Sequence, residues 1–164
     1  MKTTRWWLVR HAPVQNPERL VYGQSDMPAD LSDEKAINTL ARQLPAAATW
    51  VTSHLSRTQD TARSLQRFME ADHVLQAESG FAEQHFGDWE LQNWNDLPKG
   101  ETTRFWTDFA RQHPPKGESF ADVVGRVGPV FSRLNDAFAG RDVVAVIHGG
   151  TVRAILANAL GLSL

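Results

Sequence analysis

The sequence predicts an α/β fold, a three-layer α/β/α sandwich with a largely parallel central sheet. Two observations lead to this prediction. Short aliphatic runs alternate with segments of helical periodicity along the 164-residue chain, which is the pattern of strands joined by helical crossovers. Neither an internal repeat nor a linker interrupts the alternation, and the length suits one sizeable hydrophobic core, so we expect one domain over residues 1–164.

Four apolar runs predict the strands. They cover residues 5–9, 49–53, 73–77 and 142–147. Each run is short and is bounded by polar or turn residues, as expected for strands buried in a sheet. The last run, DVVAVI, is the most continuous, and we expect it to be the most deeply buried strand.

Apolar side chains at helical spacing predict five helices: residues 33–44, 56–69, 102–111, 119–138 and 151–160. Ser32 is the expected N-cap of the first helix. Ser119 and Asp122 resemble a capping box at the start of the fourth helix. The Gly128-Pro129 pair lies inside that helix and is expected to kink it, because proline lacks the backbone N–H of the helical ladder.

The composition excludes several functional classes. The formal net charge is −2 and no basic block is present, so we expect no nucleic-acid partner. The chain contains no cysteine, which excludes disulfides and thiolate chemistry and is consistent with a reducing, cytoplasmic location. The longest aliphatic run, residues 143–147, is too short to cross a bilayer and no signal peptide is visible, so we expect no membrane partner.

Basic side chains follow three of the predicted strands. Arg10 and His11 follow the first strand, Arg57 follows the second, and His148 follows the strand at 142–147. Because the carboxyl ends of parallel strands meet at one edge of a sheet, we expect these side chains to lie close together. The glycines that begin at Gly149 leave room for a ligand beside the N–H groups of the next helix. The set indicates a pocket for a dianion such as a phosphoryl group.

Each of these residues also has an ordinary structural interpretation. A single histidine at a strand end commonly makes a structural hydrogen bond, and an arginine on a helix commonly faces solvent. The residue pattern alone therefore leaves two interpretations open, a shared anion site or separate structural roles.

Several stretches along nearly the whole chain carry a family resemblance. They are LVRHAPV at 8–14, YGQSDMPADLS at 22–32, TSHLSRTQDTA at 52–62, FAEQHFGDWE at 81–90, PKGES at 115–119 and VIHGGTVRAILANALGL at 146–162. In this order they resemble the motifs of the histidine phosphatase superfamily, the phosphoglycerate-mutase-like enzymes. The chain departs from the usual pattern at Ala12, where glycine is common, and at His54, where proline is common.

The resemblance implies roles for five side chains. His11 would be the nucleophile that takes the phosphoryl group. Three side chains would bind the phosphoryl oxygens, namely Arg10, Arg57 and His148. Glu83 would protonate the leaving oxygen, because the family pattern places the acid a few residues before FGDW. Fixed cations suit phosphoryl transfer, whose transition state spreads negative charge over the equatorial oxygens, and an alkoxide leaving group needs a proton.

Three further residues are expected to contact substrate. Asn16 and Gln24 are polar residues in the loop after the first motif, where the family places an asparagine as a phosphate ligand, and Gly149 follows the second histidine. Ordinary loop polarity is the alternative explanation for the two amides. The role of His54, which lies near Arg57 in the sequence, stays open.

The resemblance implies a metal-independent phosphomonoesterase that forms a phosphohistidine, needs no cofactor and acts on a small phosphorylated metabolite. The YGQSD and FGDWE sequences and the short chain look most like the α-ribazole-phosphate phosphatases. Family mutases have longer segments that cover the site, whereas only residues 84–118 separate Glu83 from Ser119 here. Two alternatives stay open: a phosphoglycerate-mutase-type phosphotransferase and a non-catalytic phospholigand-binding protein on the same fold.

Two further expectations concern charge and the edge of the sheet. Repulsion from neighbouring cations should keep His11 largely neutral, and the Arg10–His11 pair should be hydrated in an empty cleft. By resemblance the strand order is 3-2-4-1, which leaves the first strand at an edge. Family members usually continue past ALGL at residues 159–162, so both a natural short form and an incomplete chain fit. A homodimer is one arrangement that would cover the edge.

Overall fold

The structure is a computed structural model that describes residues 2–162, so the two ends of the expected domain, 1–164, lie outside the described residues. In chain order the regular elements are β1 (Arg5–Arg10), α1 (Glu34–Ala41), β2 (Thr49–Thr52), α2 (Ser56–Phe68), β3 (Leu75–Ala77), α3 (Lys99–Thr107), α4 (Phe120–Ala137), β4 (Asp142–Ile147) and α5 (Gly149–Leu160). Short 3₁₀ turns lie between β3 and α3, at Ser79–Phe81, Gly87–Trp89 and Trp94–Asp96. Strands and helices alternate as the sequence predicts.

The sheet is parallel and has the order β1-β4-β2-β3, which is the expected order 3-2-4-1. At the carboxyl ends of the three neighbouring strands, Arg10 of β1 pairs with Ile147 of β4, and Thr52 of β2 pairs with Val146. These strands therefore end almost level with one another. The residues that follow them emerge together at one edge of the sheet.

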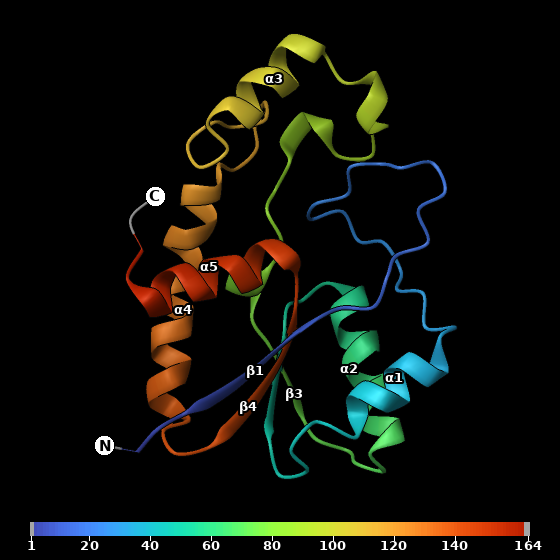
Figure 1. The fold of residues 1–164 in the computed structure, drawn as a ribbon, viewed down its shortest axis with the longest axis vertical. Coiled ribbons are helices and arrows are strands. Elements are labelled where there is room, and N and C mark those ends of the chain that lie inside the picture. The colour runs from blue at the N-terminus through green and yellow to red at the C-terminus, as the bar shows by residue number, and fades with distance from the viewer. Residues whose placement is uncertain (1, 163–164) are drawn as a thin grey trace.

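Helices cover both faces of the sheet, so the three-layer prediction is confirmed (Figure 1). Successive side chains of a strand point to opposite faces, and β4 follows this rule. One cluster joins β4 to α4 and α5 and contains Val143, Ala145, Ile147, Val123, Val127 and Ile155. The other joins β4 to α1 and α2 and contains Val144, Val146, Ile37, Ala41, Ala62 and Leu65. Residues 143–147 are fully buried, which confirms that this strand is the most deeply buried one.

Several predicted element ends are wrong by a few residues, and local hydrogen bonds explain the differences. The expected N-cap Ser32 instead donates its backbone N–H to Asp30, 3.0 Å away, within a preceding turn. Asp33 caps α1, because its carboxylate accepts from the backbone N–H of Ala36 at 2.9 Å. Helix α3 begins earlier than predicted, directly after Pro98, whose carbonyl accepts from the backbone N–H groups of Glu101 and Thr102 at 3.0 and 3.1 Å.

The start of α4 matches its prediction. Ser119 Oγ accepts from the backbone N–H of Asp122, and Asp122 accepts from the backbone N–H of Ser119, which completes the capping box. Pro129 lies inside α4, and the helix continues beyond it to Ala137; a bend at that point stays a prediction. A Cβ on Gly128 would clash with Asn158 of α5, so this glycine lets the two helices approach closely.

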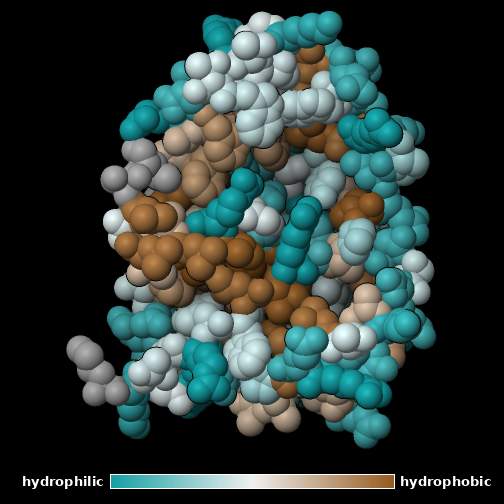
Figure 2. All heavy atoms as spheres, in the orientation of Figure 1, coloured by the Kyte–Doolittle hydropathy of each residue, from teal (hydrophilic) through white to brown (hydrophobic). Residues whose placement is uncertain are grey.

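A separate hydrophobic cluster, mostly of aromatic side chains, lies beyond the carboxyl edge of the sheet (Figure 1). Its buried members are Trp89, Leu97 and Phe105. Hydrogen bonds between the backbone of Val21 and the backbones of Leu91 and Gln92 join it to the loop after β1. Figure 2 shows a recess on this side of the molecule, between the hydrophobic band along α5 and the part that carries α3.

Candidate active site

Two histidines meet where β1 and β4 end. The backbone N–H of His11 donates to Ile147 O at 2.9 Å, which continues the strand pairing by one residue. His148 follows β4 directly, and the centroids of the two imidazole rings lie 5.1 Å apart. Both side chains are buried. The parallel register of the sheet thus brings together two residues that are far apart in the sequence.

The hydrogen bonds of His11 select its tautomer. Nδ1 lies 2.6 Å from Ala12 O, and a carbonyl oxygen can only accept, so Nδ1 carries the proton. Nε2 is then left with its lone pair. The next backbone N–H, that of Ala12, donates to Thr61 Oγ1 at 3.0 Å, and this hydroxyl in turn donates to Arg57 O. The chain that leaves β1 is therefore fastened to α2, with Nε2 available as a nucleophile.

Burial lowers the pKa of His11 from 6.5 to about 4. The hydrogen bond to Ala12 O opposes this shift, and the charges of Arg57 and Arg10 add to it. The expected neutral state follows, but its main cause is burial rather than repulsion. The expectation of a hydrated pair is wrong for one member, because Arg10 is exposed whereas His11 is only 6% exposed.

Arg57 is a fully buried cation in the first turn of α2. It donates from Nη1 to Ser25 O at 2.8 Å and from Nη2 to Gly23 O at 2.5 Å, and it lies over the ring of Tyr22. Its Nε has no partner among the described residues. Burial lowers the pKa of Arg57, but an arginine stays protonated in proteins. Unused N–H groups of a buried cation can bind an incoming anion.

A carboxylate holds the loop that receives Arg57. Glu90 accepts from the backbone N–H groups of Gln24 and Ser25, at 2.9 and 2.7 Å, and from the Ser25 hydroxyl. These bonds position the carbonyl groups on which the Arg57 guanidinium rests. The placement of the buried cation therefore depends on a residue from a distant part of the chain.

His148 is held by Ser53, a residue for which the sequence suggested no role. Ser53 directly follows β2, and its Oγ lies 2.8 Å from Nε2 of His148. Nδ1 is buried without a partner among the described residues. Burial, followed by the charges of Arg57 and His11, lowers the pKa of His148 to about 2. The site therefore contains a neutral imidazole whose Nδ1 is free to bond a ligand.

Glu83 lies at the N-terminus of α5. Its carboxylate accepts from the backbone N–H of Gly150 at 3.1 and 3.2 Å, and from the backbone N–H of Gln84 at 2.9 Å. A helix N-terminus attracts anions, so this carboxylate occupies part of an anion-binding position. At Gly149, a Cβ would lie 3.8 Å from Arg10 Nε, which places Arg10 beside the same turn. The side chain of Arg10 makes no hydrogen bond or ion pair within residues 2–162.

The side-chain amides of the two predicted loop ligands, Asn16 and Gln24, bond backbone groups of the protein. Both amide atoms of Asn16 bond the backbone of Leu20, at 2.8 and 2.9 Å, and so close their own loop. Gln24 donates from Nε2 to the backbone oxygen of Glu83 at 2.9 Å. It therefore lies against the acid-bearing segment. His54 is exposed at the start of the α2 segment.

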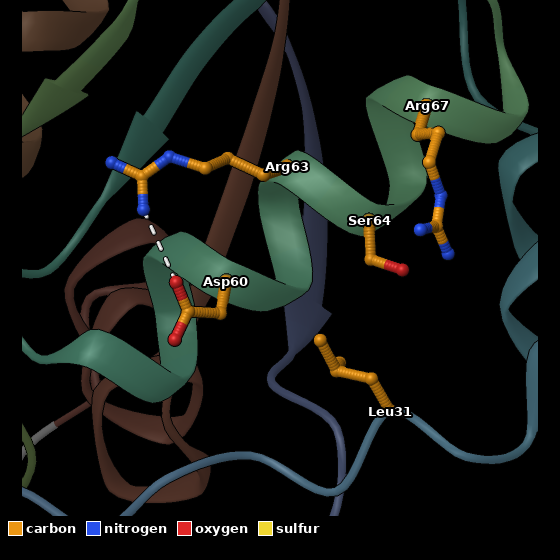
Figure 3. Close-up of a pocket in the computed structure, with 5 residues that line it drawn as sticks. All are labelled: Leu31, Asp60, Arg63, Ser64 and Arg67. Atoms are coloured by element: carbon orange, nitrogen blue, oxygen red, sulfur yellow. Dashed lines mark hydrogen bonds and ion pairs between the residues drawn. The ribbon is translucent and has the colours of Figure 1, made fainter.

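A second groove lies on the outer side of α2 (Figure 3). Its lining is Leu31, Asp60, Arg63, Ser64 and Arg67. Arg63 is bonded to Asp60 at 3.1 Å, so part of its charge is already neutralised. The groove contains no histidine, and its Asp60 carboxylate is already paired with Arg63, which makes it a poor candidate for phosphoryl chemistry. The edge at β1 and β4 is the better candidate.

Comparison with known proteins agrees with this geometry. Residues 6–164 match the histidine phosphatase superfamily (branch 1), and the chain belongs to that family. It is 31% identical over 176 residues to the glucosyl-3-phosphoglycerate phosphatase of Mycolicibacterium vanbaalenii, covering 99% of this chain and 76% of the relative. It is 32% identical over 161 residues to the 2,3-bisphosphoglycerate-dependent phosphoglycerate mutase 2 of Gloeobacter violaceus, covering 91% of this chain and 72% of the relative.

Solved structures show the same relationship. A putative α-ribazole-5′-P phosphatase from Escherichia coli superimposes with a TM-score of 0.86 at 25% identity and covers 98% of this chain and 81% of its own. The α-ribazole phosphatase from Shigella flexneri gives a TM-score of 0.84 at 25% identity, covering 97% and 81%. The predicted resemblance, near the α-ribazole-phosphate phosphatase type, is therefore confirmed. The relatives named above include both phosphatases and a mutase.

Within residues 2–162, no helix is both long and apolar enough to cross a membrane. In the same part of the chain, no three histidine, aspartate or glutamate side chains converge as the ligands of a metal ion would.

The burial of the two histidines predicts a pH dependence of stability. Both pKa values are lower in the folded protein than the ordinary 6.5, so the unfolded chain binds more protons below that pH. The free energy of unfolding is therefore highest above pH 6.5, as far as these two histidines are concerned, and falls as the pH decreases. From pH 6.5 to 4.5 each histidine is expected to remove roughly 2 to 3 kcal/mol from the free energy of unfolding. Urea unfolding at pH 7.0, 5.5 and 4.5 measures the free energy of unfolding. In His148→Gln, the slope of that free energy against pH should be about half that of the wild type.

Proposed function

We propose that the protein is a phosphomonoesterase that hydrolyses a small phosphorylated metabolite through a phosphohistidine at His11, without a metal ion or cofactor. One observation carries this proposal. His11 is buried and neutral, and its Nε2 lone pair is left free beside Arg57 and His148. An uncharged imidazole amid cations is suited to attack an anionic phosphoryl group.

The first step transfers the phosphoryl group to the enzyme. Nε2 of His11 forms a bond to phosphorus while the bond between phosphorus and the leaving oxygen breaks. Glu83, in its protonated form, gives its proton to that oxygen, and the alcohol departs. A dianion beside the Glu83 carboxylate favours the protonated form by like-charge repulsion, so substrate binding itself prepares the acid.

The second step regenerates the enzyme. The Glu83 carboxylate takes a proton from water as the water oxygen bonds to phosphorus and the bond to Nε2 of His11 breaks. Inorganic phosphate leaves, Glu83 is protonated again, and His11 recovers its lone pair. No electron donor or metal is needed for this balance.

Three side chains and a helix end stabilise the phosphoryl oxygens in this proposal. Arg10 is exposed and unpaired, and Arg57 keeps N–H groups that bond no protein atom within residues 2–162. The Ser53 hydroxyl can donate to Nε2 of His148, which leaves Nδ1–H to donate to an oxygen. The backbone of Gly149, at the start of α5, adds the helix N-terminus. Asn16 and Gln24 then support the loops around the substrate.

The similar proteins support a particular class of phosphate ester as substrate. The likeness to α-ribazole phosphatases and to a glucosyl-3-phosphoglycerate phosphatase supports a sugar or polyol phosphate. The likeness to a phosphoglycerate mutase supports phosphotransfer as the second candidate. The short segment 84–118 favours hydrolysis, because a mutase must shield its phosphoenzyme from water. We place this activity in a single cytoplasmic domain over 1–164, without nucleic acid or membrane partners.

The covalent step makes the first functional prediction. In the presence of a chelator, the wild type should release inorganic phosphate from a panel of phosphomonoesters that includes α-ribazole 5′-phosphate and glucosyl-3-phosphoglycerate. An acid-labile phosphoenzyme should appear on rapid quenching. His11→Ala should abolish both signals, because the nucleophile is gone, while the far-UV circular dichroism spectrum is unchanged. Phosphate release and quench labelling are the measurements.

Each alternative has its own result. Retained turnover in His11→Ala would exclude His11 as the nucleophile. A large loss with the chelator would indicate metal-assisted hydrolysis. Isomerisation of phosphoglycerate that requires the bisphosphorylated compound would indicate a mutase, and saturable binding without turnover of any phosphate would indicate a binding protein.

The acid makes the second prediction. Glu83→Gln cannot deliver a proton, so kcat/KM for an alkyl phosphate should fall by about 100-fold or more. An aryl phosphate such as p-nitrophenyl phosphate has a stable leaving group and should slow by less than about 10-fold. Equal losses for both substrates would make Glu83 a positioning residue and require another acid.

A glycine controls where the acid lies, which gives the third prediction. A Cβ on Gly150 would fall well inside contact distance of Glu83 Oε1. The flexible carboxylate can move away, so Gly150→Ala should keep the fold and lower kcat/KM for an alkyl phosphate by about 100-fold. Gly125→Ala is the matched control, since a Cβ there meets nothing within 4 Å from other parts of the described chain, 2–162. A fully active Gly150→Ala enzyme would contradict the assigned position of Glu83.

A further inference from the structure

Arg126 of α4 has every one of its donors engaged. A guanidinium carries five N–H groups, and five hydrogen bonds are made. Nε donates to Glu118 Oε1 at 2.8 Å and Nη2 donates to Glu118 Oε2 at 2.8 Å. Nη1 donates to the backbone oxygens of Gly80 and Ala82, at 2.9 and 3.0 Å, and Nη2 also donates to Glu83 O at 2.9 Å. One side chain thus binds three of the four carbonyl groups between residues 80 and 83.

The segment that carries Glu83 has little structure of its own. After the 3₁₀ turn at Ser79–Phe81, residues 82–86 form neither a helix nor a strand. The carbonyl of Phe81, which Arg126 does not reach, accepts from Thr151 Oγ1 at 3.1 Å. Side chains from α4 and α5 therefore replace the backbone ladder that would otherwise set the position of this segment.

Glu118 extends the same contact set to the neighbouring loops. Besides its two bonds with Arg126, its Oε2 accepts from the backbone N–H of His85 at 2.9 Å. Gln24 donates to Glu83 O, the same oxygen that Arg126 binds. The pair is about three-quarters buried, with 24% and 23% of the side chains exposed, so these bonds are shielded from competing water. The acid segment and the loop that receives Arg57 are thus tied to one guanidinium.

We propose that Arg126, clamped by Glu118, is a positioning residue that holds the Glu83 carboxyl group where the leaving oxygen departs. The inference rests on the proposed function of Glu83 as the acid. A planar fork with five donors is required, because a lysine offers one nitrogen and cannot reach three carbonyls and two carboxylate oxygens together. Arg126 does not touch the reacting atoms and acts through the backbone of residues 80–83.

The test compares two arginines of the same helix. Arg133 also pairs with a glutamate, Glu78, at 2.7 Å, but binds none of the carbonyls of residues 80–83. Arg126→Met should lower kcat for an alkyl phosphate by about 100-fold, because a displacement of the Glu83 carboxyl by about an ångström costs about that factor. Turnover of p-nitrophenyl phosphate should fall by less than about 5-fold, because a good leaving group needs no acid. Arg133→Met should change both by less than about 2-fold.

A double variant separates positioning from a general structural effect. If Arg126 acts through Glu83, the Glu83→Gln, Arg126→Met enzyme should be no slower on the alkyl phosphate than Glu83→Gln alone. Arg126→Lys keeps the charge but not the fork, and should show the same selective loss. It also serves as the test variant should the methionine substitution prevent folding, which thermal unfolding monitors.

The outcomes distinguish this inference from the function on which it rests. A wild type without phosphatase activity, or a Glu83→Gln variant without leaving-group selectivity, would overturn the proposed function and this inference with it. If those two behave as expected, equal slowing of both substrates by Arg126→Met, additive losses in the double variant, or full activity of Arg126→Lys would overturn the positioning role alone.

Discussion

The parallel pairing of β4 with both β1 and β2 is the constraint on which the rest of the molecule depends. It makes the three strands end level, so that His11, His148 and Ser53 leave the sheet at one edge. Apolar side chains on alternate faces of β4 hold that register from both sides, and a slip by one residue would turn the side chains that pack on α4 and α5 toward α1 and α2. The same interactions that bury the core therefore also set the distance between the two imidazoles.

Packing polar groups at a buried edge has an energetic consequence. Burial lowers the pKa values of both histidines and of Arg57, so the site favours neutral imidazoles and keeps a guanidinium out of water. Such groups persist because each is anchored by at least one hydrogen bond while other atoms remain unsatisfied. A dianion would satisfy those atoms. The site is thus less stable than an apolar edge would be, and it is arranged for an anionic ligand.

The proposed acid is held by a different principle from the proposed nucleophile. His11 continues a strand, and its backbone is set by the sheet. Glu83 lies in an irregular segment whose carbonyls are bound by Arg126, Thr151 and Gln24. Secondary structure therefore holds the phosphoryl-binding side of the site in place. The leaving-group side is held by polar side chains from α4, α5 and the loop after β1. The leaving-group side is therefore more sensitive to single substitutions than the phosphoryl-binding side.

The sequence by itself determined the fold class, the strand order by family resemblance, and the expectation that Arg10, His11, Arg57 and His148 share one edge. Apolar periodicity and strand-end positions are local features, so one sequence suffices for them. Only the tertiary structure decided the helix cap at Asp33, the bond from Ser53 to His148 and the clamp of Glu118 and Arg126 on residues 80–83. The partners of these contacts lie far apart in the chain or compete with equally polar neighbours, and no local pattern selects among them.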